Sequence, residues 1–392
     1  MSVSKSNFTA TMDQSSRRAI AGSIAVSIAF VIELTLVPLI LPAIQTQFGW
    51  DISTVAWVFN SYGISVAFGV LIGGWLGDVF GIRKVFSIGV LFFASGAFIV
   101  SLAGSFETMI AGRILQGFGG GVFSPLVPLL LTRAVPHRPG KILMIWGSIV
   151  GYVAAFAPLA LGQTLSNTGW QSAFVLFAFI SAIALIICGK MKAGPQHATI
   201  QTLPNLTLLL RARALWFVFG YVFCTYGSIT FYLFRQPLRL AEKGYDLTTN
   251  GFILSVIWLS FSIAGTLLRN RVDGPHVRYI MFVAPIIIAS GFLVAYLSDS
   301  IPAYMASAAL IGIGFAFSNA PSTQMVLKFA PEGMSAISTS LDITFARLGG
   351  VMTVAFLAQA SFDTSMFVPI GMSLVAVFFS MISFRKASDH YS

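Results

Sequence analysis

The chain has 392 residues, a formal net charge of +10, 56% hydrophobic residues and only 9% charged residues. Soluble proteins average about 25% charged residues, so this composition excludes an ordinary soluble domain. Apolar runs of about 18 residues or more recur along the whole length, and each can cross the ~30 Å hydrocarbon core of a bilayer as a helix. The sequence therefore predicts a polytopic membrane protein.

The apolar runs predict an all-α membrane protein with twelve transmembrane helices. Their approximate ranges are 19–44, 53–76, 85–102, 108–131, 141–165, 171–189, 214–234, 250–268, 279–297, 302–327, 335–360 and 366–384. The longest polar interruption carries one glycine, two prolines and basic residues at both ends, which is typical of a linker. The predicted parts are an N-terminal tail at 1–18, a six-helix bundle at 19–189, a linker at 190–213, a second six-helix bundle at 214–384 and a C-terminal tail at 385–392.

Lys and Arg residues gather on one side of the predicted membrane. They lie mainly in residues 5–18, 83–84, 133–141, 190–213, 269–278, 328 and 385–386. Short loops rich in Lys and Arg stay on the cytosolic side of a membrane, so we expect both tails and the linker in the cytosol. Because the positive charge is spread over short loops, it does not indicate a nucleic acid partner.

Cysteine and histidine usage gives no sign of a disulfide framework or a metal site. Cys188 and Cys224 both lie in apolar runs, and the four histidines are scattered in or near loops. No nucleotide-binding signature and no nucleophile triad occurs. We therefore expect neither a metal nor another cofactor, and no enzyme activity.

Residues 73–84 separate the second and third predicted helices. Their glycines permit tight backbone geometry and close helix approach, which predicts a sharp turn at the cytosolic surface. Gly74, Asp78, Gly81, Arg83 and Lys84 match the pattern Gly-x-x-x-Asp-Arg-x-Gly-x-Arg-Lys between helices 2 and 3 of the major facilitator superfamily. The chain therefore resembles this family. The resemblance implies two pseudo-symmetric six-helix halves around a midplane cavity, with this segment as a conformational gate.

Glu33 lies midway along the first predicted helix, where a charged side chain costs roughly 2.5–3.5 kcal/mol on insertion scales. Desolvation disfavours a charged carboxylate and a nearby cation favours it, so a buried acid that gains and loses a cationic partner is a natural proton switch. Glu33, Thr35, Leu41 and Pro42 resemble the helix 1 motif of drug:proton antiporters, Asp-x-Thr-x-x-x-x-x-Leu-Pro. The alternative is a Glu that is hydrogen-bonded in the bundle without a role in transport.

Arg113 lies in the fourth predicted helix, ahead of Gln116, Gly117 and Gly119. These residues resemble the superfamily pattern Arg-x-x-Gln-Gly-x-Gly, whose glycines let the helix approach its neighbours. An arginine keeps its charge inside a bundle and needs an anion or a carbonyl as partner. We expect Arg113 to form with Glu33, directly or through water or Gln116, the pair that protonation breaks. A fixed structural arginine is the alternative.

Pro158 and Gly162 lie in the fifth predicted helix and resemble the antiporter signature Gly-x-x-x-Gly-Pro-x-x-Gly-Gly. Ala157 and Leu161 replace two of its glycines. The signature is taken as a mark of exporters over importers, so a partial match weakens the case for export. Pro158 removes a helical hydrogen bond and permits a bend, and we expect it to act in the conformational gate.

Asp342 and Arg347 lie in the eleventh predicted helix on different faces, because successive helical residues turn by about 100°. Asp342 is expected to be a second acid that couples protons or faces the substrate. The alternative is a cap or a partner for a loop lysine. Two roles stay open for Arg347: a contact with an anionic substrate, or a structural contact.

Polar and aromatic residues of several predicted helices are candidates for binding substrate. They are Glu33, Arg113, Gln116, Tyr152, Tyr226, Asn319 and Arg347. An aromatic side chain in a membrane helix more often packs or faces lipid than binds substrate, so each tyrosine has that alternative.

The resemblance implies a monomeric secondary transporter in a bacterial inner membrane, powered by the proton gradient. Its expected partners are a small-molecule substrate, protons and the lipid bilayer. The first hypothesis is export of small amphipathic molecules by alternating access, with Glu33 as the proton switch. The second is transport in either direction of an anionic metabolite or a metal chelator such as a carboxylate siderophore, bound by Arg113 and Arg347.

Overall fold

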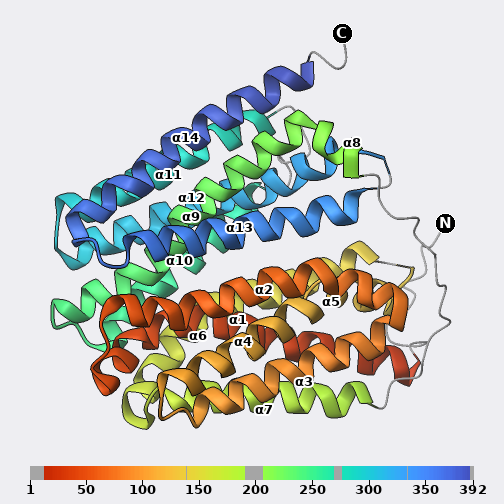
Figure 1. The fold of residues 1–392 in the computed structure, drawn as a ribbon, viewed down its shortest axis with the longest axis horizontal. Helices are drawn as coiled ribbons and strands as arrows, with labels where there is room; N and C mark the ends of the chain where they lie inside the picture. Colours follow the sequence, from red (N-terminus) through yellow and green to blue (C-terminus); the bar gives the residue numbers. More distant parts are fainter. Residues whose placement is uncertain (1–12, 138, 190–205, 269–275, 333, 389–392) are drawn as a thin grey trace, which may run out of the picture.

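The computed structural model describes residues 13–137, 139–189, 206–268, 276–332 and 334–388. These residues form fourteen helices and no strand, which confirms the predicted all-α class (Figure 1). The helices are α1 (Gln14–Phe48), α2 (Ile52–Phe80), α3 (Ile82–Ser101), α4 (Phe106–Phe123), α5 (Leu126–Ala134), α6 (Pro139–Thr168), α7 (Gln171–Gly189), α8 (Leu206–Arg211), α9 (Arg213–Glu242), α10 (Leu247–Leu268), α11 (Val277–Leu297), α12 (Ile301–Phe329), α13 (Ser335–Leu357) and α14 (Phe362–Ser388).

Twelve segments are long and apolar enough to cross a membrane, as the apolar runs predict. The fourth predicted helix is broken in the structure into α4 and α5, because Pro125 lacks the backbone N–H that would continue the ladder. The helix α8 lies in the predicted linker, whose residues 190–205 fall outside the described part of the chain.

Several helix ends differ from the predicted ends. Helix α1 begins at Gln14, inside the predicted N-terminal tail, and α14 continues to Ser388, inside the predicted C-terminal tail. Residues 1–12 and 389–392 of these tails lie outside the described residues. The predicted end of α9 at residue 234 is wrong, because the helix passes Pro237 and ends at Glu242.

The turn predicted at residues 73–84 is much shorter than expected. Helix α2 continues to Phe80, α3 begins at Ile82, and the single residue Gly81 joins them with a φ of 91°. This φ lies in the region that side chains with a Cβ rarely adopt, so glycine is required at this joint. Gly74 is therefore a residue of α2 rather than of a loop.

The helices form two bundles that lie side by side, one from α1 to α7 and one from α9 to α14 (Figure 1). Between them, α2 packs on α13, α6 packs on α10, and α1 packs on α9. The second span of each bundle thus meets the fifth span of the other, which is the pairing expected of two pseudo-symmetric halves.

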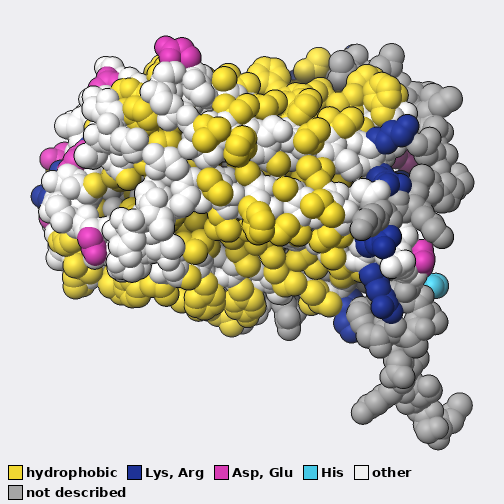
Figure 2. All heavy atoms as spheres, turned by 90° about the horizontal axis from the view of Figure 1, so that it is seen from below, with side chains coloured by type: hydrophobic (Ala, Val, Ile, Leu, Met, Phe, Trp, Pro, Cys, Tyr) yellow, Lys and Arg dark blue, Asp and Glu magenta, His cyan; other side chains and the backbone are white. Residues whose placement is uncertain are grey.

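The surface has the charge distribution of a membrane-spanning protein. Figure 2 shows a broad hydrophobic belt, with Lys and Arg side chains near one end of the molecule and Asp and Glu side chains near the other. We call the first the basic end, after Arg83, Lys84, Arg133, Arg211 and Lys328. The opposite end, where α1 joins α2 and α9 joins α10, is called the far end.

The two bundles touch from the far end to past the middle of the molecule. Along α6 and α10, Thr248 donates a hydrogen bond to Gln163 at 3.0 Å near the far end, and Ser262 donates one to the carbonyl of Gly151 at 3.4 Å further along. Nearer the basic end, a Cβ added to Gly147 or to Gly265 would meet no atom within 4 Å. This conformation is closed at the far end.

Candidate functional site

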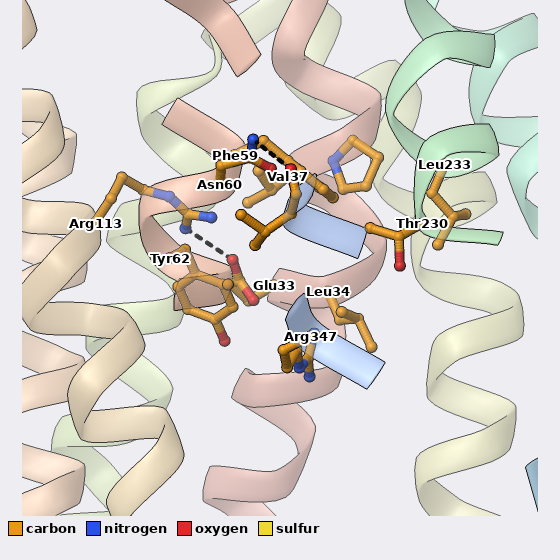
Figure 3. Close-up of a pocket in the computed structure, with 13 residues that line it drawn as sticks. Glu33, Leu34, Val37, Phe59, Asn60, Tyr62, Arg113, Thr230, Leu233 and Arg347 are labelled. Atoms are coloured by element: carbon orange, nitrogen blue, oxygen red, sulfur yellow. Dashed lines mark hydrogen bonds and ion pairs between the residues drawn. The ribbon is translucent and has the colours of Figure 1, made fainter. Parts of the chain in front are cut away.

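A buried ion pair joins α1 to α4 at the centre of the first bundle. Arg113 Nη1 lies 2.7 Å from Glu33 Oε1, and each side chain is 1% exposed. Figure 3 shows the two side chains pointing toward one another from different helices. The sequence predicts this pair, directly or through Gln116, and the structure places the two groups in direct contact.

Arg113 has several contacts besides its ion pair with Glu33. The same Nη1 donates to Gln116 Oε1 at 2.8 Å, and Nε donates to the backbone carbonyl of Val58 at 3.0 Å. The guanidinium carbon lies 4.3 Å from the ring centroid of Tyr62 and 5.8 Å from that of Phe174. A carboxylate, an amide, a carbonyl and two rings together compensate the cost of burying this charge.

The glycines of α4 explain how Arg113 comes so close to the neighbouring helices. A Cβ on Gly117 would lie 2.5 Å from the carbonyl oxygen of Tyr62 in α2, and one on Gly119 would lie 2.3 Å from the backbone nitrogen of Phe93 in α3. No side chain fits at either position. The pattern Arg-x-x-Gln-Gly-x-Gly thus serves helix packing and charge placement together.

Four buried polar atoms around the pair have no hydrogen-bond partner within the described ranges. They are Glu33 Oε2, Asn60 Oδ1, Tyr62 Oη and Gln116 Nε2. Buried polar atoms are bonded in the great majority of proteins, so four together mark a place where polar groups are ready to exchange partners. Glu33 thus holds Arg113 through Oε1, while the geometry of its Oε2 completes no hydrogen bond with the polar groups around it.

A small central cavity opens beside this pair and lies between the two bundles (Figure 3). Its lining residues are Glu33, Leu34, Val37, Pro38, Phe59, Asn60, Tyr62, Gly63, Arg113, Thr230, Leu233, Arg347 and Val351. Its volume is about 50 Å³, which holds a water molecule or two but no drug-sized molecule, since such sites have roughly 300–1,000 Å³. A cargo of that size needs a wider conformation.

Arg347 reaches the central cavity from α13 in the second bundle. It is partly exposed and, in contrast to Arg113, it forms no hydrogen bond or ion pair with any residue that the structure describes. The cavity thus has one neutralised arginine and one arginine with its donors available.

Asp342 lies apart from the central cavity. It is 6% exposed, accepts a hydrogen bond from Thr323 Oγ1 at 3.3 Å, and its Oδ1 has no partner in the described part of the chain. Of the three predicted proton-coupling residues, the structure brings Glu33 and Arg113 together and leaves Asp342 between α12 and α13.

Three further substrate-binding candidates also lie away from the central cavity. Tyr226 in α9 donates a short hydrogen bond to Asn319 in α12, and its ring packs edge-on against Phe315. Tyr152 in α6 is 61% exposed on the surface of the bundle. None of these three side chains lines the cavity with Glu33.

Of the predicted gate residues near Gly81, Arg83 has a hydrogen bond within the first bundle. Arg83 Nη2 donates to the backbone carbonyl of Gly189 at 2.7 Å, which ties the start of α3 to the end of α7. Lys84 is exposed and a Cβ on Gly74 would meet open space. The side chain of Asp78 lies outside what the structure describes.

Pro158 lies at the contact between the bundles rather than near Gly81. A Cβ on Gly251 of α10 would lie 2.5 Å from the carbonyl oxygen of Pro158 in α6. A residue predicted for the gate from the family signature therefore marks the closest approach of these two helices.

Sequence reasoning missed the contributions of α2 to the site. Asn60 Nδ2 donates to the carbonyl of Val351 in α13 at 3.1 Å, which crosses between the bundles. Tyr62 covers the guanidinium of Arg113, and Val58 supplies only its backbone oxygen. An amide in an apolar helix was a signal for Asn60, but no sequence signal marks a backbone carbonyl.

The comparison with known families decides the assignment. The family profile described as Major Facilitator Superfamily matches residues 22–354, most of the chain. The chain belongs to the major facilitator superfamily. Members of this superfamily are membrane transporters rather than enzymes, and the solved structures that resemble this member are transporters as well.

Curated relatives of this superfamily member include export proteins. The chain is 28% identical over 271 residues to the tetracenomycin C resistance and export protein of Streptomyces glaucescens, which covers 66% of this chain and 46% of that protein. It is 28% identical over 182 residues to the multidrug export protein EmrB of Haemophilus influenzae, covering 46% of this chain and 36% of that protein. The chain therefore spans less than half the length of these relatives.

Solved structures confirm the fold of this superfamily member. The nucleoside transporter NupG superposes with a TM-score of 0.73 at 17% identity over 94% of this chain and 99% of that chain. A D-xylose–proton symporter superposes with a TM-score of 0.71 at 15% identity, covering 94% and 96%. At these identities the likeness shows the fold alone.

Proposed function

We propose that this transporter exports small amphipathic molecules in exchange for protons by alternating access. The observation that carries the proposal is the Glu33–Arg113 pair, with both side chains 1% exposed at the wall of a cavity between the bundles. A mid-membrane acid that is paired with a cation at the wall of a cavity is suited to take up and release a proton. Relatives described as resistance and export proteins support the cargo and the direction.

In the proposed cycle, protonation of Glu33 removes its attraction for Arg113. Arg113 keeps the hydrogen bonds to Gln116 and to the carbonyl of Val58, so it stays in place while Glu33 is released. The connection between α1 and α4 loosens, the two bundles rock, and the cargo leaves on one side while the proton leaves on the other. The segment around Asp78 and Gly81 is proposed to close the basic end in the opposite conformation.

The proposed setting is a bacterial inner membrane with both termini in the cytosol. Lys and Arg side chains near the basic end support this orientation (Figure 2). The far end, which is closed in this conformation, then faces outward. The proton gradient is the proposed energy source, no cofactor is invoked, and the proposed transport unit is a monomer.

A Glu33→Gln variant tests the proton switch in proteoliposomes. The amide keeps the shape and a hydrogen-bond acceptor but cannot exchange a proton, so transport driven by a pH gradient should fall to background while binding of the cargo persists. A Glu242→Gln variant is the matched control, because Glu242 also pairs with an arginine, Arg235 at 2.8 Å, but lies at the far end outside the cavity. Normal gradient-driven accumulation in the Glu33→Gln variant would refute the proposal.

A second candidate cargo is an anionic metabolite or a metal chelator such as a carboxylate. The observation that favours it is Arg347, which lines the central cavity with no ion-pair partner among the described residues. Thermal-shift measurements separate the two candidates. Stabilisation by hydrophobic cations alone supports drug export, and stabilisation by polycarboxylates alone supports an anionic cargo.

A further inference from the structure

A second and larger cavity lies at the far end, between the same two bundles. Its volume is about 460 Å³, within the range of roughly 300–1,000 Å³ that is typical of small-molecule sites. The first bundle contributes residues of α1 and α6 together with Trp170, and the second contributes residues around the α9–α10 connection. We call it the far-end cavity.

The far-end cavity has no charged lining residue. Trp170 and Tyr245 give it an aromatic wall, while Gln47 and Ser166 at its rim are exposed. This lining differs from that of the central cavity, where Glu33, Arg113 and Arg347 all carry charge. The far-end cavity therefore suits an uncharged molecule.

A buried polar group of the far-end cavity is unpaired among the described residues. Asn250 is 2% exposed, and its Nδ2 donates to the carbonyl of Pro237 at 3.1 Å. Its Oδ1 has no partner in the part of the chain that the structure describes. In contrast, Gln47 Oε1 already accepts from Trp170 Nε1 at 2.7 Å. Asn250 thus brings an unpaired hydrogen-bond acceptor to the wall of the cavity.

Helix α1 runs past both cavities in turn. Val37 and Pro38 line the central cavity, and Ile40 and Pro42 line the far-end cavity. Leu39 stands between them in the sequence and is fully buried. The two cavities therefore lie next to each other along α1.

Leu39 lies beside a close contact between α6 and α10. A Cβ on Gly251 would lie 2.5 Å from the carbonyl oxygen of Pro158 and 3.6 Å from Leu39 Cδ2. Leu39, Pro158 and Gly251 come from three helices and both bundles, and we call them the constriction.

We propose that the far-end cavity is a release-side binding site for an uncharged aromatic molecule with a hydrogen-bond donor, separated from the central cavity by the constriction. The term release-side rests on the proposed function, in which the far end faces outward. The molecule packs against Tyr245 and the small accessible part of Trp170, which is 2% exposed, and donates its hydrogen bond to Asn250 Oδ1.

Protection from thiol labelling tests this site without a transport assay. Cys188 and Cys224, both buried, are replaced by serine, and Ser166→Cys places one reactive thiol at the rim. The purified protein in lipid nanodiscs is labelled with a water-soluble maleimide in the presence of N-phenyl-1-naphthylamine. This probe is uncharged and aromatic and carries one N–H donor. We expect it to slow labelling several-fold in a concentration-dependent manner.

Filling the cavity distinguishes binding from a general effect of the probe on the bilayer. Ala43→Phe, or Ala241→Leu if the first variant does not fold, places extra volume inside the cavity, and either should abolish protection. Asn250→Leu should weaken protection, because it removes the acceptor while nearly keeping the volume. Absence of protection in the parent protein, or equal protection in the filled variant, would overturn the proposal.

The outcome for this site is separable from the outcome for the proposed function. Protection that is present in a protein unable to exchange protons for cargo refutes the transport proposal and keeps the site. Gradient-driven export without any protection refutes the site and keeps the transport proposal.

Discussion

The two bundles differ in whether the charged side chains near the middle of the membrane are paired. In the first, Glu33 and Arg113 form a fully buried pair, with two further hydrogen bonds on the arginine. In the second, Asp342 and Arg347 lie on one helix, and neither has an ion-pair partner among the described residues. An unpaired charge at this depth is costly. Under the proposed function, the first bundle holds the proton switch, whereas Asp342 and Arg347 of the second are left for a partner from outside the chain.

Removing the arginine from the first bundle should have the largest effect. An Arg113→Gln variant leaves Glu33 buried without its cation, and breaking a buried pair in this way costs about 3–5 kcal/mol. We expect a correspondingly large loss of stability in denaturation measurements in detergent. Restoration of most of that stability by a second change, Glu33→Gln, would show that the orphaned charge is the cause.

Replacing the arginine of the second bundle by glutamine tests whether the two arginines differ in their contribution to stability. An Arg347→Gln variant breaks no hydrogen bond or ion pair of the described residues, so its stability should lie within about 0.5 kcal/mol of the parent protein. Equal losses of stability in the Arg347→Gln and Arg113→Gln variants would contradict the inference that only Arg113 is held by a buried ion pair.

A Gly251→Ala variant tests how tightly the two bundles are joined at the constriction. The added Cβ would lie 2.5 Å from the Pro158 carbonyl oxygen, and such overpacking costs typically 1–3 kcal/mol. We expect the closed far end to open, which spin labels at positions 167 and 249 would report as a longer distance. The matched control is Gly265→Ala on the same helix, whose Cβ meets nothing within 4 Å, and its label distance should not change.

Arg347 also separates the two candidate cargoes. A charge-assisted hydrogen bond contributes about 1.5–3 kcal/mol, so loss of Arg347 should weaken binding of a carboxylate about tenfold or more. Isothermal titration with an anionic and a neutral compound of similar shape measures this difference. Equal affinities in the parent and the Arg347→Gln variant would assign Arg347 a structural role.

A small effect is also expected at the far end of the second bundle, where charges are paired but exposed. Lys243 Nζ lies 2.5 Å from Asp299 Oδ2, and Asp299 is 45% exposed. The hydrogen bond from Lys243 is the first cause that lowers the pKa of the Asp299 carboxyl. Such exposed pairs contribute about 0–1 kcal/mol, so Asp299→Asn should cost less than about 1 kcal/mol.

The pH dependence at Asp299 has a defined sign. Because the folded-state pKa is lowered, the contribution to stability is fully present above the ordinary carboxyl pKa of about 3.9 and is lost as the pH falls through the lowered value. The difference in unfolding free energy between the parent and Asp299→Asn should therefore vanish in acid. A difference that grows in acid would contradict this assignment.

The sequence predicts the central pair because charged residues stand out in apolar helices. Glu33 and Arg113 each break an apolar run, and family patterns place both. Helix number follows from the same runs. Helix ends are less predictable, since α9 passes the expected end at residue 234 and Arg235 is instead buried and paired with Glu242 at 2.8 Å.

The site residues that the sequence does not predict contribute uncharged groups. The carbonyl of Val58 on Arg113, the ring of Tyr62 over it and the free Oδ1 of Asn250 depend on which side of a helix faces a neighbour. All these helices are apolar on most sides, so no periodic pattern marks the inward face. The far-end cavity therefore emerges only from the arrangement of the two bundles.

The bond from Arg83 to the carbonyl of Gly189 has a mechanical consequence. Gly189 is the last residue of α7, where the chain leaves the first bundle, and Arg83 follows the one-residue joint at Gly81. A pull on the last residue of α7 is therefore shared with the start of α3, next to that joint, so the end of α7 is anchored within the first bundle.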